Sequence, residues 1–378
     1  METTVLYVHV PFCTGKCNYC SFYSVAPTEE QLVRYLHALE KEANLVFHEY
    51  FDPVRPRLES IYIGGGTPTR LEESQLEQLA LTLRKFCLPT DDVEYTVETS
   101  PETTTAGKLA VLRRAEVNRM SLGVQSFDDE RLAALGRRHR AEDSRRSVRE
   151  IRSAGIEDLS IDLIYGTPDQ SLAAWRWELE RAVELGPEHV ACYELTLEAG
   201  TPAWLWRDRM PEEGLLIEMY YLAEQVLSAG GYRHYEISNY ARPGYESWHN
   251  LRYWHNLSYI GLGPSAAGYL GGVRYTNVAD LEKYDTMLLS RGHRPVESAE
   301  RPAGLLLAGE TAMLNLRMRR GIDRREFMGR TGFDPFAIFA ERLDRLREAG
   351  LIETDSNHIR LSRKGLVLSN EVMAEFLP

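Results

Sequence analysis

The sequence is short of cysteine, of long apolar runs and of positive charge. Only five cysteines occur among 378 residues, which argues against the disulfide framework of a small secreted scaffold. No run approaches the roughly 20 apolar residues that a membrane span needs, and the residues after Met1 form neither a basic nor an apolar leader. The net charge of −12 argues against bulk nucleic-acid binding, which needs a basic face. We therefore expect a soluble, cytoplasmic protein with no transmembrane segment and no nucleic-acid partner.

Three of the five cysteines lie close together near the start of the chain. Cys13, Cys17 and Cys20 have the spacing C-x3-C-x2-C and follow an apolar run that predicts a short strand. Three thiolates are one too few for a closed tetrahedral zinc site, but they suit a [4Fe-4S] cluster in which one iron stays open. S-adenosylmethionine can bind such an open iron through its amino and carboxylate groups. The other two cysteines, Cys87 and Cys192, are expected to be buried structural residues.

Up to about residue 200 the sequence alternates β-rich apolar runs with amphipathic helical patterns. Six such units in series predict a parallel sheet with functional loops at the carboxyl ends of its strands. Because six units are too few to close an eight-stranded barrel, the expected fold is α/β, with a partial (β/α)6 barrel over residues 1–200. Thr28 and Gln31 predict a capping box at the first helix, and Gly155 and Gly186 are expected at helix ends. The expected strands are 5–10, 60–63, 93–98, 119–124, 159–164 and 189–195, and the expected helices are 29–49, 74–86, 106–114, 142–154 and 172–185.

The remaining part of the sequence has a different character. Residues 201–300 are rich in Gly, Tyr and Trp and contain one clear helical pattern, at 213–229. This region is expected to cover the barrel. Residues 301–378 have helical patterns at 303–316 and 334–349, followed by two short strands around a polar turn, which predicts a winged-helix-like domain. Its many acidic residues favour packing or a partner role over DNA binding.

Glycines and polar residues recur where the predicted strands end. Gly65, Gly66 and Thr67 follow the second strand, and glycines let backbone groups approach a ligand closely. Because the carboxyl ends of parallel strands meet at one edge, we expect these residues to share a pocket with the cysteines. The other candidates are Glu98, for ribose hydroxyls or an amino group; Gln125; Arg137, for a bidentate pair with a carboxylate; and Asp162, a strand acid that needs a hydrogen-bonding partner.

With these motifs the chain resembles the oxygen-independent coproporphyrinogen III oxidase-like branch of the radical S-adenosylmethionine superfamily. The resemblance covers essentially the whole chain and implies that Cys13, Cys17 and Cys20 are the cluster ligands. The motifs that carry it are Tyr7-Val-His-Val-Pro-Phe-Cys13, Gly64-Gly-Gly-Thr-Pro68, Asn118-Arg-Met-Ser-Leu-Gly-Val-Gln-Ser-Phe127, Leu135-Gly-Arg-Arg-His139, Asp162-Leu-Ile-Tyr-Gly166 and Tyr193-Glu-Leu-Thr196. The implied contacts to S-adenosylmethionine are Tyr7, Tyr19, Gly65, Gly66, Thr67, Glu98, Gln125, Arg137 and Asp162.

One position separates two groups within this branch. The group that oxidatively decarboxylates coproporphyrinogen III has a fourth cysteine two residues after the third, and here that position is Phe22. That group also carries an extension before its first strand, whereas this strand begins within a few residues of Met1. Both features favour the heme chaperone group, so coproporphyrinogen III dehydrogenase activity is not expected.

The heme chaperone group binds heme through a motif H-N-x-x-Y, which His249-Asn-Leu-Arg-Tyr253 matches. Histidine and tyrosine are both competent axial ligands of heme iron, and flat aromatic side chains are frequent around the motif. The same composition also fits an aromatic segment that packs on the barrel with His249 hydrogen-bonded inside. The resemblance favours heme binding within residues 201–300, and it leaves open which of His249 and Tyr253 would bind the iron.

Three functions are compatible with these patterns. The first is a heme chaperone that binds heme, S-adenosylmethionine and a [4Fe-4S] cluster, and passes heme to an acceptor protein. The second is a radical enzyme that acts on a porphyrin or another tetrapyrrole. The third, a DNA-binding regulator, is disfavoured by the acidic charge balance. The resemblance further implies an electron donor such as a flavodoxin or ferredoxin.

Overall fold

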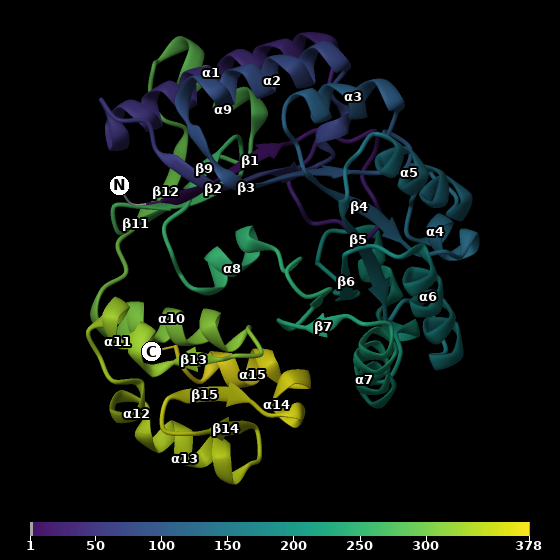
Figure 1. Cartoon of the computed structure of the whole chain (residues 1–378), viewed down its shortest axis with the longest axis vertical. Helices are drawn as coiled ribbons and strands as arrows, with labels where there is room; N and C mark the ends of the chain where they lie inside the picture. The colour runs from purple at the N-terminus through teal and green to yellow at the C-terminus, as the bar shows by residue number, and fades with distance from the viewer. Residues whose placement is uncertain (1–2, 378) are drawn as a thin grey trace.

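The computed structural model describes residues 3–377, and its centre is a nine-stranded sheet with strand order β7-β8-β6-β5-β4-β3-β2-β1-β9. The strands β1 to β6 follow the chain order and pair in parallel. Their helices cover the outer face of the curved sheet (Figure 1). This arrangement confirms the predicted α/β partial barrel.

The barrel strands are β1 (Thr4–Val10), β2 (Arg57–Gly65), β3 (Leu88–Thr99), β4 (Arg119–Gln125), β5 (Asp158–Tyr165) and β6 (His189–Glu194). The helices between them are α1 (Glu29–Phe51), η1 (Pro68–Arg70), α2 (Glu73–Phe86), α3 (Ala106–Arg114), α4 (Asp129–Ala134), α5 (Ala141–Ser153) and α6 (Leu172–Leu185).

Local signals in the sequence set the ends of these helices. The Thr28 hydroxyl accepts from the backbone N–H of Gln31, and the Gln31 side chain accepts from the N–H of Thr28, so the predicted capping box is present. Gly186 ends α6 with φ +67°, and Gly155 follows the end of α5 with φ +77°. Glycine adopts this left-handed backbone without a steric penalty, which explains why both helices stop at these positions.

Short elements of the region after β6 extend both edges of the sheet. β9 (Ile260–Leu262) pairs in parallel with β1, and β8 (Asn239–Ala241) pairs antiparallel with β6. The predicted helix at 213–229 is confirmed as α7 (Glu213–Ala229). The other elements of this region are η2 (Pro202–Arg209), β7 (Arg233–His234), α8 (Trp248–Trp254), β10 (Ala267–Leu270), β11 (Val273–Asn277), α9 (Leu281–Asp285), η3 (Thr286–Ser290) and β12 (Val296–Glu300).

The C-terminal part of the chain has a hydrophobic core of its own and lies beside the barrel (Figure 1). Its three strands form a separate sheet in the order β13-β15-β14. The predicted helix at 334–349 is interrupted, because Phe339 leaves helical geometry and buries its ring in this core. The elements are α10 (Gly304–Leu316), β13 (Ile322–Asp323), α11 (Arg324–Thr331), α12 (Pro335–Ile338), α13 (Ala340–Glu348), β14 (Ile352–Thr354), β15 (His358–Leu361), α14 (Arg363–Val367) and α15 (Ser369–Ala374).

Two global expectations concern membrane spans and cysteines. Within residues 3–377, none of the helices combines the length and the apolar character that membrane crossing requires. All five cysteines are free thiols. Cys87 and Cys192 are buried in the barrel core, as predicted, whereas Cys13, Cys17 and Cys20 are only partly buried.

Candidate functional site

The loop after β1 carries the three clustered cysteines, and backbone hydrogen bonds fix it at both ends. Cys13 donates its N–H to the carbonyl of Val25, and Val25 donates to that of Pro11, so the loop closes on its own base. Further along, Asn18 donates its backbone N–H to Leu135 and accepts at its carbonyl from Ala203 in η2. The cysteines are therefore held by segments that lie far apart in the sequence.

The cysteine loop borders a cavity of about 430 Å³ at the carboxyl ends of the strands. The cavity collects residues from all six parallel strands or their following loops. Most of the site residues predicted from the sequence line it. They are Cys13, Cys17, Tyr19, Cys20, Gly65, Gly66, Thr67, Glu98, Gln125, Arg137 and Asp162.

Arg137 is a cation that contacts the cysteine loop directly. Its Nη1 donates to Cys17 Sγ at 3.6 Å, and its Nη2 donates to the Gly123 carbonyl at 2.9 Å. Glu102 lies 4.0 Å from Arg137 and 3.3 Å from His139 Nδ1. Burial alone would raise the pKa of Glu102, but His139 and Arg137 outweigh it and lower the pKa to about 2. The guanidinium therefore faces a cysteine sulfur and a carboxylate, and it remains charged.

Glu98 is a partly buried acid near the end of β3. Its Oε1 accepts from the Tyr62 hydroxyl at 2.8 Å, and its Oε2 accepts from the Gly65 N–H at 3.0 Å. Burial raises the pKa of Glu98 to about 7, and nearby Asp162 adds to the shift, while both hydrogen bonds oppose it. A carboxyl with this pKa can bind a ligand amino group as an anion or donate a proton to an oxygen acceptor.

Asp162 and Gln125 complete the polar wall of the cavity. Burial raises the pKa of Asp162 to about 6, partly offset by Arg119 and by a 3.4 Å hydrogen bond from Ser121. Gln125 ends β4 with φ +66°, a left-handed conformation that is uncommon for a residue other than glycine. Backbone strain of this kind recurs at ligand sites, where the surrounding structure holds it in place.

Close backbone packing explains two glycines of the β2 loop. A Cβ at Gly66 would lie 2.7 Å from the Phe12 carbonyl oxygen, and a Cβ at Gly65, where φ is +109°, would lie 2.6 Å from the His9 ring. The loop therefore approaches the base of the cysteine loop more closely than any side chain would allow.

Tyr7 differs from the other predicted contacts, because it is not among the residues that line the cavity. Its hydroxyl lies 3.0 Å from His9 Nδ1, and its ring packs against Tyr62 and His249 inside the barrel. The cavity in turn includes residues that were not predicted as cofactor contacts. Those from β6 and the loop after it are Tyr193, Glu194, Leu195, Thr196 and Glu198, and those from earlier segments include Phe22, Ser100, Glu102, Ser121 and Gly123. The motif Tyr193-Glu-Leu-Thr196 could have identified the first set, because it lies at the end of a predicted strand, as the other predicted site residues do.

The three thiols of the cysteine loop are a donor set that suits a four-iron cluster, in which each thiolate binds its own iron. Burial raises the pKa of Cys13 and of Cys20, so metal binding would have to displace their protons.

The motif His249-Asn-Leu-Arg-Tyr253 lies on α8, and neither His249 nor Tyr253 is among the residues that line this cavity. In Figure 1, α8 lies between the concave side of the barrel and the C-terminal part of the chain. His249 is 1% exposed. Its Nδ1 lies 2.9 Å from Ser60 Oγ in β2, and its Nε2 lies 2.8 Å from the Tyr253 hydroxyl. Burial, with a smaller contribution from Arg119, lowers the pKa of His249 to about 3.

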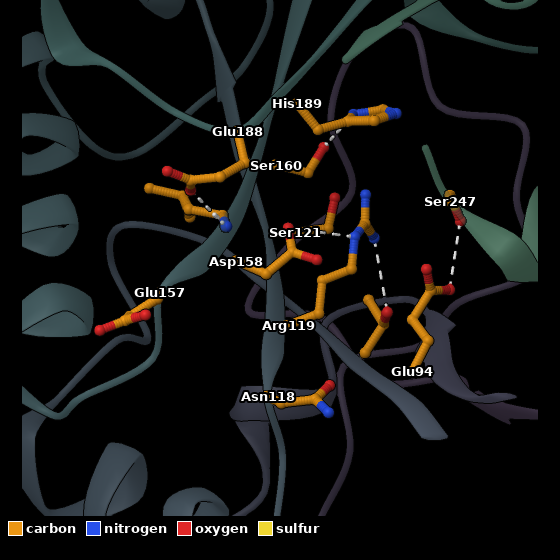
Figure 2. Close-up of polar contacts among 12 residues, drawn as sticks. Glu94, Asn118, Arg119, Ser121, Glu157, Asp158, Ser160, Glu188, His189 and Ser247 are labelled. Carbon is orange, nitrogen blue, oxygen red and sulfur yellow. Dashed lines mark hydrogen bonds and ion pairs between the residues drawn. The ribbon is translucent and has the colours of Figure 1, made fainter. Parts of the chain in front are cut away.

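A layer of polar residues, several of them fully buried, crosses the inside of the barrel (Figure 2). Arg119 lies in its centre, with Nε 3.6 Å from Asp158 and Nη1 3.4 Å from Thr96 Oγ1. On one side, Glu94 accepts a hydrogen bond from Ser247 at the start of α8. On the other, His189 Nδ1 lies 2.8 Å from Ser160 Oγ.

Sequence comparisons assign the two halves of this architecture. Residues 7–182 match the profile of the Radical SAM superfamily, and residues 307–368 match that of the HemN C-terminal domain. The chain is 35% identical to the heme chaperone HemW of Bacillus subtilis over 98% of each protein. It is 31% identical to the heme chaperone HemW of Escherichia coli, covering 98% of this chain and 97% of that protein. For the protein of the same name from Mycobacterium tuberculosis the identity is 33%, with 98% and 94% covered.

Among solved structures, the fold matches coproporphyrinogen III oxidase (HemN) from Escherichia coli, described as a radical SAM enzyme. The TM-score is 0.86 and the alignment covers 99% of this chain and 90% of that one. The sequence identity of 24% makes this a likeness of fold alone. It accounts for both the partial barrel and the C-terminal module within one architecture.

Proposed function

The chain belongs to the heme chaperone HemW family of the radical SAM superfamily, and we propose that it binds heme and transfers it to an acceptor protein. The observation that carries this proposal is the match to several HemW proteins from one end of the chain to the other. The match includes the barrel, the segment with the H-N-x-x-Y motif and the C-terminal module.

We propose that Cys13, Cys17 and Cys20 hold a [4Fe-4S] cluster. Support comes from their free thiols, their place on a cavity of about 430 Å³ and the guanidinium of Arg137 near Cys17. The Arg137 charge would offset part of the negative charge of the thiolates. When bound, such a cluster supplies single electrons at low potential and an open iron that S-adenosylmethionine can bind.

We propose that S-adenosylmethionine binds in the same cavity. Arg137 is available for the ligand carboxylate, and Glu98 and Asp162 for its amino group or ribose hydroxyls. Gly65, Gly66 and Thr67 offer backbone groups and a hydroxyl at close range. The remaining candidate contacts are Tyr7, Tyr19 and Gln125, of which Tyr7 would act from behind the cavity wall.

His249 and Tyr253 are the proposed axial ligands of heme iron. They lie four residues apart on one face of α8, and His249 Nε2 lies 2.8 Å from the Tyr253 hydroxyl. Either side chain could therefore bind the iron of a single heme. Both side chains are neutral at physiological pH, because burial lowers the pKa of His249 and raises that of Tyr253. A neutral imidazole is the form that binds iron.

We further propose a division of the chain into three parts. Residues 1–200 form the radical SAM barrel, residues 201–300 cover it and carry the heme motif, and residues 301–378 form the winged-helix-like domain. The partners would be heme, a heme-requiring acceptor protein and an electron donor such as a flavodoxin or ferredoxin. A cytoplasmic location would keep the thiols reduced for cluster assembly.

Heme titration under anaerobic conditions tests the proposed function. The cluster is reconstituted, hemin is added, and the Soret absorbance is followed for wild type, His249→Ala and Tyr253→Ala. Saturable one-to-one binding that either substitution weakens by about tenfold or more would support the proposal. His48→Ala, an exposed histidine on α1, is the matched control and should bind as wild type does. Absence of heme binding with an intact cluster would contradict it.

The cavity itself keeps a second function open, that of a radical enzyme acting on a porphyrin or another tetrapyrrole. It contains a complete set of polar candidates for S-adenosylmethionine, and Tyr193, Glu194 and Thr196 extend its lining beyond them. Product formed in molar excess over protein, with release of 5′-deoxyadenosine, would favour this function. Phe22 in place of a fourth cysteine argues against coproporphyrinogen decarboxylation.

A further inference from the structure

The structure holds the two proposed heme ligands in a state that cannot bind iron. Both ring nitrogens of His249 are occupied, Nδ1 by Ser60 and Nε2 by the Tyr253 hydroxyl. The Tyr62 ring lies 5.1 Å from the imidazole, and the Tyr253 ring lies 4.6 Å from that of Tyr259. These rings are in contact with one another, so there is no space between them for a porphyrin. Iron can therefore reach His249 only after α8 has moved away from the barrel.

Glu94 is the main contact that keeps the start of α8 in place. Its carboxylate accepts from the backbone N–H of Trp248 at 2.9 Å and of His249 at 3.1 Å, and from the Ser247 hydroxyl at 3.3 Å. These N–H groups are among those that a helix leaves unpaired at its first turn. The helix dipole adds a further attraction for a negative charge at this end.

The register of the sheet places this anchor beside the heme motif. Ser60 on β2 and Glu94 on β3 are directly paired residues of neighbouring strands. Ser60 contacts the His249 side chain while Glu94 contacts its backbone, so two adjacent strands hold the same residue. Loss of the Glu94 contacts would free the backbone of His249 and leave its side chain bonded to Ser60.

Arg119 is the cation beside Glu94 inside the barrel. The guanidinium is 2% exposed, and the charges of Glu94 and Asp158 on either side of it both stabilise its protonated form. In Figure 2 it lies between these two acids. If α8 moves away, Glu94 loses three hydrogen bonds but keeps a nearby cation.

We propose that Glu94 is a positioning residue for heme ligation, which holds α8 against the barrel and lets heme bind only when the first turn of the helix is released. This inference rests on the proposed function, because it concerns access to His249 and Tyr253. It adds a control step to heme uptake: the ligands stay paired with each other until the contacts of Glu94 break.

Glu94→Gln tests the proposal with almost no change in shape. The amide removes the charge and turns an NH2 group toward backbone donors, so the first turn of α8 should open more often. Hydrogen exchange of the backbone amides of Trp248 and His249 should accelerate by about tenfold. The rate of hemin association, followed by stopped-flow Soret absorbance, should rise by a similar factor. Ser60→Ala provides a second way to loosen α8, since it removes the hydrogen-bond partner of His249 Nδ1.

Asp280→Asn is the matched control, because Asp280 caps α9 by accepting one hydrogen bond from the Lys283 N–H, and α9 packs against α1 and η3. It should change neither the exchange in α8 nor the hemin rate. Faster exchange in Glu94→Gln without faster hemin binding would overturn the proposal, as would unchanged exchange in α8. If wild type and all variants fail to bind hemin, the proposed function itself fails, and the exchange data still report whether Glu94 holds the helix.

Discussion

Burial controls the protonation of single ionisable side chains inside the barrel. His249 is the clearest case, because both of its nitrogens have neutral partners and its pKa is lowered to about 3. Glu98 shows the opposite shift for an acid, with a pKa raised to about 7. The interior therefore favours neutral groups wherever no ligand supplies a compensating charge.

The lowered pKa of His249 predicts a loss of stability in acid. The unfolded chain binds a proton at His249 below about pH 6.5, whereas the folded chain binds it only near pH 3. Stability is therefore lost as pH falls through this window, by about 2 kcal/mol at pH 5 from this residue alone. Between pH 7 and pH 5, the free energy of unfolding measured with denaturant should fall by about 2 kcal/mol less in His249→Gln than in wild type.

An exposed histidine gives the comparison for this prediction. His48 is 77% exposed on α1, and His48→Gln should leave the acid dependence of stability as it is in wild type. Equal acid dependence in wild type and His249→Gln would show that the buried imidazole does not resist protonation in the folded protein.

The three clustered cysteines differ from the buried pair in what their loss should do. Cys17→Ala removes one of three thiolates, and the iron content after reconstitution should fall from about four per chain to less than one. Cys87→Ala removes a buried thiol whose partner is the carbonyl of Leu83, and iron content should not change. Iron analysis with the visible absorbance of the cluster measures both. Equal loss in the two variants would argue against the proposed ligand set.

At the scale of elements, the contact between the β2 loop and the cysteine loop depends on missing side chains. Gly66 donates its N–H to Val10, and Thr67 donates to Phe12, so the two loops share backbone hydrogen bonds. The space for a Cβ at Gly66 is already taken by the Phe12 carbonyl. The geometry of the cysteine loop is thus set by a neighbouring strand.

Gly66→Ala should therefore disturb the proposed cofactor site. We expect a backbone shift at Phe12, a destabilisation of about 1–3 kcal/mol and weaker cluster reconstitution. Gly214→Ala, with no atom within 4 Å of the new Cβ in α7, should raise stability by up to about 1 kcal/mol and leave the cluster unaffected. Thermal unfolding and iron content distinguish the two. Normal reconstitution in Gly66→Ala would show that the loop contact is not required.

The regular elements of the barrel could be predicted from sequence because their signals are local. Thr28 with Gln31, and Gly155 and Gly186, set helix ends through backbone geometry within a few residues. The α8 helix could not be predicted, since its seven residues are stabilised by Glu94, which lies more than 150 positions earlier in the chain. The break at Phe339 was also missed, because a tertiary core overrides the helical pattern there.

At the scale of the whole molecule, α8 also contacts the C-terminal part of the chain. Arg317, which ends α10, lies 4.3 Å from the ring centroid of Trp254 and 4.0 Å from Glu236, a fully buried acid. Asn315 donates to the Trp254 carbonyl at 2.7 Å. The helix with the heme motif is therefore held by the barrel on one side and by the C-terminal core on the other.

Arg317→Ala should weaken this junction. The substitution removes the cation over Trp254 and leaves Glu236 without its counter-charge, a loss of about 2 kcal/mol or more in the free energy of unfolding. Arg345→Ala breaks an ion pair with Glu375 whose side chains are both largely exposed, so stability should hardly change. Urea unfolding measures both variants. An equal effect would mean that the junction contributes no more than a surface ion pair.

The sequence by itself determined the partial barrel, the candidate cluster cysteines and the strand-end residues, because strand ends of a parallel sheet converge wherever the chain alternates β and α. Only the tertiary structure decided that Tyr7 lies behind the cavity and that His249 and Tyr253 are paired inside the barrel. Those outcomes depend on residues such as Ser60 and Glu94, which are remote in sequence and meet α8 only when the sheet has formed. Burial and partner choice are properties of packing between distant segments, and no local pattern encodes them.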